Sequence, residues 1–315
     1  MIQFLKTIDN RVQPVDGLTE GCWVNVVAPD KQELDYLTGE LGLDRDFVLS
    51  SLDEEESSRI DSEEEQTLVI VDLPTAEKPS ENAAEKAIVY STMPMGIILT
   101  PNYVITILLR PHQVITELAE GRIKNVTTHL RTRFLLSLLL RIATRYLMYL
   151  KQIDKISSLT EHQLHKSMKN KELIQLLGLE KSLVYFSTSL KGNEITLEKI
   201  LRGRILKLYE EDQDILEDVL IEVKQAIEMC NIYSSILSGT MDAFASIISN
   251  NLNIVMKVLT SITIVMAIPT IVSSFYGMNV QGGMPLDQFW WFPVALSGVI
   301  SVIVALVLAK TNMFR

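Results

Sequence analysis

Side chains with oxygen atoms recur inside a segment of this 315-residue chain that has no charged residue. Residues 258–286 hold no Asp, Glu, Lys or Arg, yet they include several serines and threonines. Such hydroxyls commonly donate to the carbonyl four residues earlier in their own helix or bind a neighbouring helix, and this accounts for most of them. Neutral oxygen atoms are also ligands that hard divalent cations accept.

We predict that some of these oxygen atoms share one face of a helix. Ala267 and Thr270 follow Asn253 by 14 and 17 residues, and Asp242 lies eleven residues before it. These spacings are interpreted as one narrow stripe that carries Asp, Asn, Ala and Thr. In a homo-oligomer that turns this stripe toward its symmetry axis, rings of oxygen atoms would line a central path.

Two apolar residues in the same stretch, Met256 and Leu259, could narrow such a path. A ring of apolar side chains excludes water and thereby stops ions. Two membrane spans in one subunit cannot enclose a path alone. The channel hypothesis therefore requires several copies of the chain.

The uncharged segment contains Tyr276-Gly277-Met278-Asn279, which has the residues of a helix terminus. Gly tolerates a left-handed backbone and Asn often replaces it, so an ordinary helix end is one interpretation. The last carbonyl groups of a helix also lack helical partners and carry partial negative charge. Several subunits that end this way around one axis would form an oxygen-lined cation site. Such a site suits hydrated Mg²⁺, which gives up its water reluctantly, and no thiolate or imidazole cluster lies nearby to favour zinc or copper.

Two apolar stretches predict the helices that position these groups. Residues 258–286 and 288–309 are uncharged, and about 20 residues of helix cross the ~30 Å hydrocarbon layer of a membrane. We expect spans at about 254–276 and 290–309, within a transmembrane hairpin of residues 253–315 that ends in a short tail. Two buried helices of a soluble protein are the alternative, but uncharged stretches this long are rare in soluble cores.

Basic residues flank the two expected spans. Lys257 precedes the first span, Lys310 and Arg315 follow the second, and the connecting loop has none. Positive charge is retained on the cytoplasmic side, and the N-terminus does not resemble a signal peptide. We therefore expect a multi-pass protein of the cell membrane, in contact with lipid, with both termini in the cytoplasm.

The remainder of the chain predicts a cytoplasmic α/β domain followed by a helical stalk, so the expected fold class is an α+β membrane protein. Residues 1–112 alternate short β-rich runs with short helices. Residues 113–252 have helical periodicity and form the expected stalk, whose last helix leads directly into the first span. Strands are expected at 23–27, 67–71, 86–91, 96–99 and 103–109, helices at about 30–41, 46–52, 128–166, 170–190 and 211–276, and a turn at 191–194.

The composition argues against several classes of protein. The net charge of -10 argues against nucleic acid as a partner, because phosphate binding needs clustered Lys and Arg. Neither a paired nucleophile and base nor a phosphate-binding loop is present, so we expect neither an enzyme nor ATP as a partner. Residues 53–65 hold eight acidic residues and one basic residue, which indicates a solvated loop or edge, or else a surface that attracts cations. Cys22 and Cys230 are expected to be reduced thiols.

The C-terminal part resembles the CorA family of magnesium transporters. The resemblance rests on Met256-Lys257-Val258-Leu259-Thr260, the pair Pro269-Thr270, Tyr276-Gly277-Met278-Asn279, the loop residues Met284-Pro285 and an aromatic start to a short second span. It is strong over residues 237–314 and extends over the rest of the chain as architecture, an α/β domain followed by a long-helix stalk. The Gly-Met-Asn signature is highly specific in this context.

This resemblance implies a homopentameric channel that gives passive Mg²⁺ influx and is gated by intracellular Mg²⁺, so that the ion is both transported and regulatory. Gly277 and Asn279 would form the outer selectivity site. Asp242 falls where the family has its regulatory aspartate, and Asp218 matches a second acidic position. The ion pathway would contain Asn253, Met256, Leu259, Ala267, Thr270, Tyr276 and Met278.

The sequence departs from the family pattern in three places. The acidic partners of the regulatory aspartate align with Leu49-Ser50-Ser51, so the site between subunits would use Asp53 or Glu54 instead, or be weakened. The loop motif reads Met284-Pro285-Leu286-Asp287, which leaves Asp287 as the acidic residue at the mouth. The basic tail is reduced to Lys310 and Arg315.

Two other functions stay open at this point. A related transporter of Co²⁺, Ni²⁺ or Zn²⁺ is one alternative, although the zinc pathway of this superfamily has a different residue in place of Met278. A membrane-anchored helical scaffold that carries no ion is the alternative from another class. For a channel, the membrane potential supplies ~4.6 kcal/mol per divalent ion per 100 mV, which is twice ~2.3 kcal/mol per charge.

Overall fold

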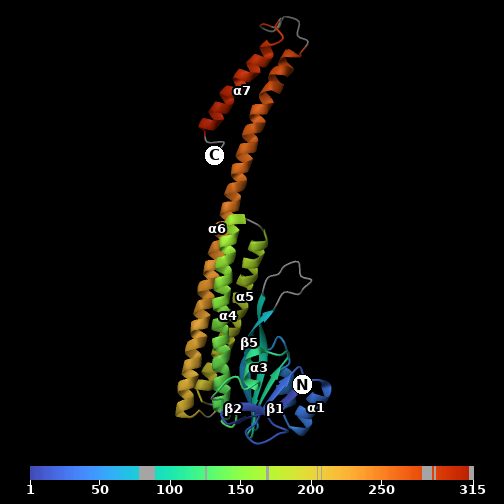
Figure 1. Cartoon of the computed structure of the whole chain (residues 1–315), viewed down its shortest axis with the longest axis vertical. Helices are drawn as coiled ribbons and strands as arrows, with labels where there is room; N and C mark the ends of the chain where they lie inside the picture. The colour runs from blue at the N-terminus through green and yellow to red at the C-terminus, as the bar shows by residue number, and fades with distance from the viewer. Residues whose placement is uncertain are drawn as a thin grey trace. The chain divides into compact units, whose positions relative to one another are not determined.

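The computed structural model describes residues 1–77, 89–124, 126–167, 170–203, 205–206, 208–278, 286 and 289–311. The chain divides into two compact units, Met1–Gly239 and Thr240–Arg315. Figure 1 shows the first unit as a sheet with long helices beside it and the second unit as two helices that lie side by side.

The described residues of the first unit contain seven strands, which form one mixed sheet in the order β2-β1-β3-β7-β6-β5-β4. The central strands β3 and β7 pair in parallel, and all other neighbours pair antiparallel. Strands that are covered on both faces are mostly apolar. β3 and β7 fit this, with one buried polar residue each, Asn25 and Thr106. The strands are β1 (Ile2–Ile8), β2 (Arg11–Pro14), β3 (Trp23–Val27), β4 (Arg59–Glu63), β5 (Gln66–Glu77), β6 (Val89–Leu99) and β7 (Val104–Leu108).

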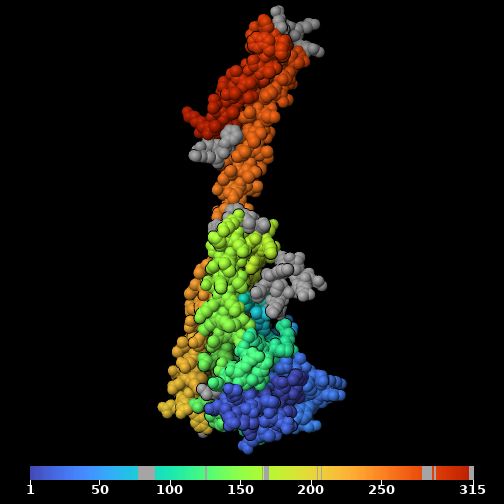
Figure 2. Space-filling model, in the orientation of Figure 1, coloured from blue at the N-terminus to red at the C-terminus, as the bar shows by residue number. Residues whose placement is uncertain are grey.

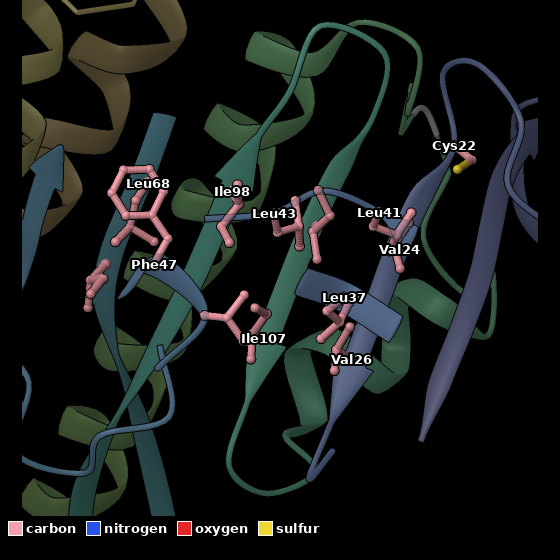
Figure 3. Packing of buried hydrophobic residues seen from close by; sticks show 13 residues of the cluster. Cys22, Val24, Val26, Leu37, Leu41, Leu43, Phe47, Leu68, Ile98 and Ile107 are labelled. Atoms are coloured by element: carbon pink, nitrogen blue, oxygen red, sulfur yellow. The ribbon is translucent and has the colours of Figure 1, made fainter. Parts of the chain in front are cut away.

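One face of the sheet is covered by the segment that follows β3. Successive residues of a strand point to opposite faces, so Val24, Val26 and Ile107 lie together on this side with Leu37, as Figure 3 shows. Asp30 starts the covering segment with a capping box to Glu33. The segment comprises α1 (Lys31–Asp35), the π-helix η1 (Tyr36–Glu40) and α2 (Arg45–Ser50).

The other face packs against long helices. Trp23 contacts Phe134 of α4 with ring centroids 5.1 Å apart, and its indole nitrogen donates to the Thr106 hydroxyl at 2.9 Å. An edge-on contact between Tyr146 and Phe186, at 5.1 Å, joins α4 to α5. The long helices that contact the sheet are α4 (Arg131–Ser167) and α5 (Asn170–Leu201). The short helix α3 (Gln113–Ala119) contacts β2 and α4, and α6 (Glu210–Tyr276) begins in this unit.

The turn expected at residues 191–194 is wrong, because α5 continues through this segment to Leu201. The buried amide of Asn193 accepts from the N–H of Asp72 at 2.9 Å and donates to its carbonyl at 3.0 Å. The pairing of β4 with β5 ends at Ile70. The Asn193 side chain therefore bonds the backbone of β5 at Asp72, where β4 no longer does so. Gly192 permits the close approach, since an added Cβ would lie 3.2 Å from the Ser58 hydroxyl. Two typical turn residues therefore join a helix to a sheet.

The other secondary-structure predictions for this unit are confirmed in outline. The strands expected at 86–91 and 96–99 belong to one strand, β6, and residues 86–88 lie outside the described residues. Part of the acidic segment forms the edge strand β4, where charge discourages pairing with another chain. Strands β1 and β2 are not predicted from the sequence, because polar and apolar residues do not alternate cleanly in them.

The second unit holds the C-terminal part of α6 and α7 (Phe292–Lys310). Both helices contain stretches long and apolar enough to cross a membrane. Only 6% of the residues in each stretch are buried in the single chain, unlike those of a core helix. Figure 2 shows α7, in red, alongside the end of α6. The predicted fold class is thereby confirmed: a soluble α/β domain, a long helix and two apolar C-terminal helices.

Candidate ion-conducting site

One face of α6 in the second unit is buried. Ser261 is fully buried and Val272 is 8% exposed, with Val265 and Ile268 half-buried between them. At about 100° per residue, these four positions lie within a sector of about 60°. On α7, Ser297 is buried. This sector is the face of α6 that packs toward α7.

Most residues predicted for the ion pathway lie on the opposite side of α6. Tyr276 is an exception, because its ring contacts Phe292 of α7. At about 100° per residue, the positions from Asn253 to Thr270 in the predicted set fill a sector of about 120°, centred about 150° from the α7-facing side. The side chains in this sector are exposed, including Met256 at 52% and Leu259 at 56%. Asp242, which is also exposed, falls in the same sector.

The narrow stripe expected from the sequence is therefore broader. Ala267 lies about 40° from Asn253, but 17 residues of helix turn Thr270 about 100° away from Asn253. The polar positions form one face of the helix rather than one line along it. In an oligomer, a face of this width would turn more than one residue of each helical turn toward the central path.

Three further hydroxyl residues, Thr260, Thr263 and Ser274, fall within this exposed sector. The Thr263 hydroxyl donates to the Leu259 carbonyl at 2.8 Å, which leaves its oxygen lone pairs on the exposed side. From the sequence, such hydroxyls are expected to bond to their own backbone. Their helical angle from Asn253 is the signal that also places them on this face. We define the pathway face of α6 as Asn253, Met256, Leu259, Thr260, Thr263, Ala267, Thr270 and Ser274.

α6 ends where the sequence predicts the selectivity site. The Gly277 N–H donates to the Ser273 carbonyl at 3.0 Å, and a Cβ added to Gly277 would lie only 3.2 Å from the same oxygen. Met278, which follows, is 56% exposed. Asn279 and the predicted mouth residue Asp287 lie outside the described residues. Glycine at position 277 thus lets the chain leave the helix close to its last carbonyl groups.

The predicted regulatory acids Asp242, Asp218 and Asp53 are all exposed. The Asp53 carboxylate accepts from the Glu55 N–H at 3.0 Å, which stabilises the turn after α2. Among the described residues, no group of three or more His, Cys, Asp or Glu side chains could hold a metal ion. The described residues of one chain therefore do not bring these three acids together with further acidic, cysteine or histidine ligands.

Ser50 and Ser51, where the family resemblance implies acidic partners of the regulatory aspartate, make other contacts in this structure. Ser51 is fully buried, donates to the Phe47 carbonyl at 2.7 Å and packs on Gly96, where an added Cβ would lie 1.8 Å from the Ser51 hydroxyl oxygen. The Ser50 hydroxyl accepts from Arg59 at 3.2 Å. This end of α2 therefore offers hydroxyls and a neighbouring guanidinium where a cation site would need carboxylates.

A hollow of about 580 Å³ in the first unit lies between the first turns of α4 and α6. Arg133 lines it, forms an ion pair with Glu211 and lies 3.5 Å from the carboxylate of Asp212. Because these acids already have a cationic partner, the hollow is a poor site for a metal ion. The chemistry suited to cations remains on α6 in the second unit.

The chain matches the family described as CorA-like Mg²⁺ transporter protein over residues 19–310. The cobalt/magnesium transport protein CorA of Methanocaldococcus jannaschii is 27% identical over 300 residues, which cover 92% of this chain and 90% of that protein. The protein of the same name from Thermotoga maritima is 25% identical over 327 residues, which cover 98% and 88%. The complete CorA magnesium transporter structure from M. jannaschii has a TM-score of 0.80 at 23% identity and covers 99% of this chain and 96% of that chain.

The family match spans nearly the whole chain, so this protein belongs to the CorA-like Mg²⁺ transporter family. It is a membrane protein that transports divalent cations, the activity that defines this family. The solved structure establishes that both units, including the two apolar helices, follow the CorA fold.

We expect Gly277→Ala to lower divalent-cation uptake without preventing assembly. The new Cβ would lie 3.2 Å from the Ser273 carbonyl oxygen, so the helix end must shift by a few tenths of an ångström. Gly298→Ala in α7 is the matched control, because its Cβ meets nothing within 4 Å. Uptake into proteoliposomes that contain equal amounts of each variant measures the effect. Equal uptake by the two variants would contradict a role for Gly277 in the ion site.

Proposed function

We propose that this chain is the subunit of a channel for passive Mg²⁺ influx across the cell membrane. The observation that carries the proposal is the pathway face of α6, which bears amide and hydroxyl oxygens on the side opposite α7 and leads to the helix end at Gly277. Carbonyl and amide oxygens at that end suit the hydration shell of Mg²⁺. Met256 and Leu259 form the apolar constriction in this proposal.

The proposed assembly is a homopentamer, the number that the family resemblance implies. A single chain leaves the pathway face uncovered, and polar groups that face lipid are costly. The first unit also exposes large apolar side chains on α6, including Ile221 at 63%, Ile232 at 52% and Ile236 at 54%. Neighbouring subunits would bury this apolar surface, while the pathway faces would meet around water and ions.

We infer a multi-pass topology with both termini in the cytoplasm. Lys257 and Lys310 lie at the same end of the two antiparallel helices, and the residues between them include no basic side chain. This distribution matches the preference of basic residues for the cytoplasmic side. An inside-negative potential then drives a divalent cation inward without ATP.

Two alternative functions are weaker. Transport of Co²⁺ alongside Mg²⁺ is consistent with the names of the two curated relatives, both cobalt/magnesium transport proteins. Transport of Zn²⁺ or Ni²⁺ lacks support from thiolate or imidazole ligands among the described residues of the pathway face. A scaffold without ion transport gives no reason for an oxygen-bearing exposed face in a membrane helix.

We expect Asn279→Ala to reduce Mg²⁺ uptake strongly, because the selectivity site loses an amide oxygen from every subunit. Asn250→Ala is the control, as it makes the same change at an exposed position outside the pathway sector of α6. Mg²⁺ uptake driven by an imposed inside-negative potential is the measurement. Unchanged uptake by Asn279→Ala would contradict the pore assignment, and equal loss in both variants would indicate a general defect.

We propose further that intracellular Mg²⁺ closes the channel through acidic residues contributed by more than one subunit. Asp242 and Asp218 on α6 are exposed and able to meet a neighbouring chain. Asp53 is the proposed partner in the α/β domain, because the end of α2 supplies no carboxylate at Ser50 or Ser51.

We expect Asp242→Lys and Asp218→Lys to weaken the dependence of closure on internal Mg²⁺, since a fixed ammonium replaces a carboxylate ligand. Glu228→Lys, which makes the same charge change at another exposed position of α6, is the control. Channel current measured against internal Mg²⁺ concentration tests this. Normal closure after both aspartates are changed would show that sensing lies elsewhere.

A further inference from the structure

An aromatic contact joins the end of α6 to the start of α7 in the second unit. Tyr276 is the last residue of α6, and Phe292 is the first residue of α7. Their ring centroids are 6.2 Å apart with the planes at 62°, an edge-to-face arrangement. Pairs of this geometry are favourable beyond the apolar area that they bury. The two ends of residues 277–291 are therefore held against each other.

Phe292 is itself fixed by the residues before it. Its N–H donates to the Phe289 carbonyl at 3.0 Å, and the Ala295 N–H donates to the Trp291 carbonyl at 3.0 Å. Its ring lies 6.4 Å from that of Trp291, which in turn lies 5.9 Å from the ring of Phe289. Phe292 is thus the inner member of an aromatic cluster at the start of α7, defined as Phe289, Trp291 and Phe292.

The partner of this cluster stands directly before the proposed ion site. Gly277 follows Tyr276, and its N–H binds back to the Ser273 carbonyl at 3.0 Å. A Tyr276 ring held in place fixes the backbone from which Gly277 departs. Ion and catalytic sites hold their geometry only when the supporting side chains keep their groups within about 0.5 Å.

We propose that Phe292 is a positioning residue for ion selection. It acts from α7 through the ring of Tyr276 and sets where the last carbonyl groups of α6 stand in each subunit. This inference rests on the proposed function, because it assigns a support to the site at Gly277. α7 therefore contributes to selection without contacting the ion.

The test compares Phe292→Leu with Trp290→Leu in the full-length protein. Leucine keeps an apolar side chain at position 292 but removes the ring edge. Trp290 is two residues away and 85% exposed, so its substitution removes an aromatic side chain from the same segment without removing the Tyr276 contact. The readout is the Mg²⁺ concentration that gives half-maximal uptake, together with the ratio of Mg²⁺ to Co²⁺ uptake.

We expect Phe292→Leu to raise the half-maximal concentration about two- to tenfold, the factor that loss of an aromatic pair represents. Its uptake ratio should change as well, whereas Trp290→Leu should leave both quantities unchanged. Phe292→Tyr keeps the ring and should restore both. Adding Phe292→Leu to Tyr276→Leu should have no further effect, because the two rings act as one contact.

Four results would overturn the proposal. The first is that Phe292→Leu and Trp290→Leu have the same half-maximal concentration and the same uptake ratio. The second is that Phe292→Tyr differs from the unchanged protein in these two quantities. The third is that the double variant of Tyr276→Leu and Phe292→Leu raises the half-maximal concentration by the product of the two single effects. A Phe292→Leu protein that loses maximal uptake at an unchanged half-maximal concentration and ratio would show a merely structural role. Failure of the proposed function itself is seen separately, as normal Mg²⁺ uptake by Asn279→Ala.

Discussion

The structure depends on a constraint that the membrane places on α6: oxygen-bearing side chains in an apolar helix must face something other than lipid. The α7-facing side of α6 is occupied by residues such as Ser261 and Val272, and the pathway face lies about 150° away at about 100° per residue. A single chain cannot cover that face. In the proposed assembly, further copies of the chain would cover this face and create an oxygen-lined route. One pattern of residues would then account for both assembly and ion conduction.

The N-terminal part of α6 packs in the first unit, whose helices and sheet are held together by buried contacts. Asn193 joins α5 to the edge of the sheet by two hydrogen bonds to Asp72, and Tyr146 donates to the carbonyl of the same residue at 3.1 Å. Three elements, α4, α5 and β5, therefore meet at one backbone position. Lys224 of α6 lies 3.8 Å from Glu194 of α5, and this distance in an exposed pair contributes little. The buried apolar residues of α6, such as Leu216 and Val223, hold it to this unit instead.

Much of this account could be predicted from the sequence because it depends on local patterns. Long uncharged stretches predict the two spans, and apolar residues three and four apart predict α6. The segment Tyr276-Gly277-Met278-Asn279 predicts where α6 ends. Predictions failed where tertiary contacts decide. Gly192 and Asn193 have turn propensity, but contacts with Ser58 and Asp72 keep α5 helical. The ring contact between Tyr276 and Phe292 joins residues that are 16 apart in the chain. Local residue preferences do not predict such a contact.

The central claim is that the pathway face of α6 lines water. Single cysteines at Asn253, Thr263 and Thr270, compared with Val265, Ile268 and Val272 on the α7-facing side, test it by reaction with a polar thiol reagent. The native thiols interfere little, since both are buried and burial raises the pKa of Cys230 to about 12. The account predicts that the first three cysteines react, that Mg²⁺ slows them, and that the other three do not react. Equal reactivity on both sides, or reaction confined to the α7-facing side, would contradict it.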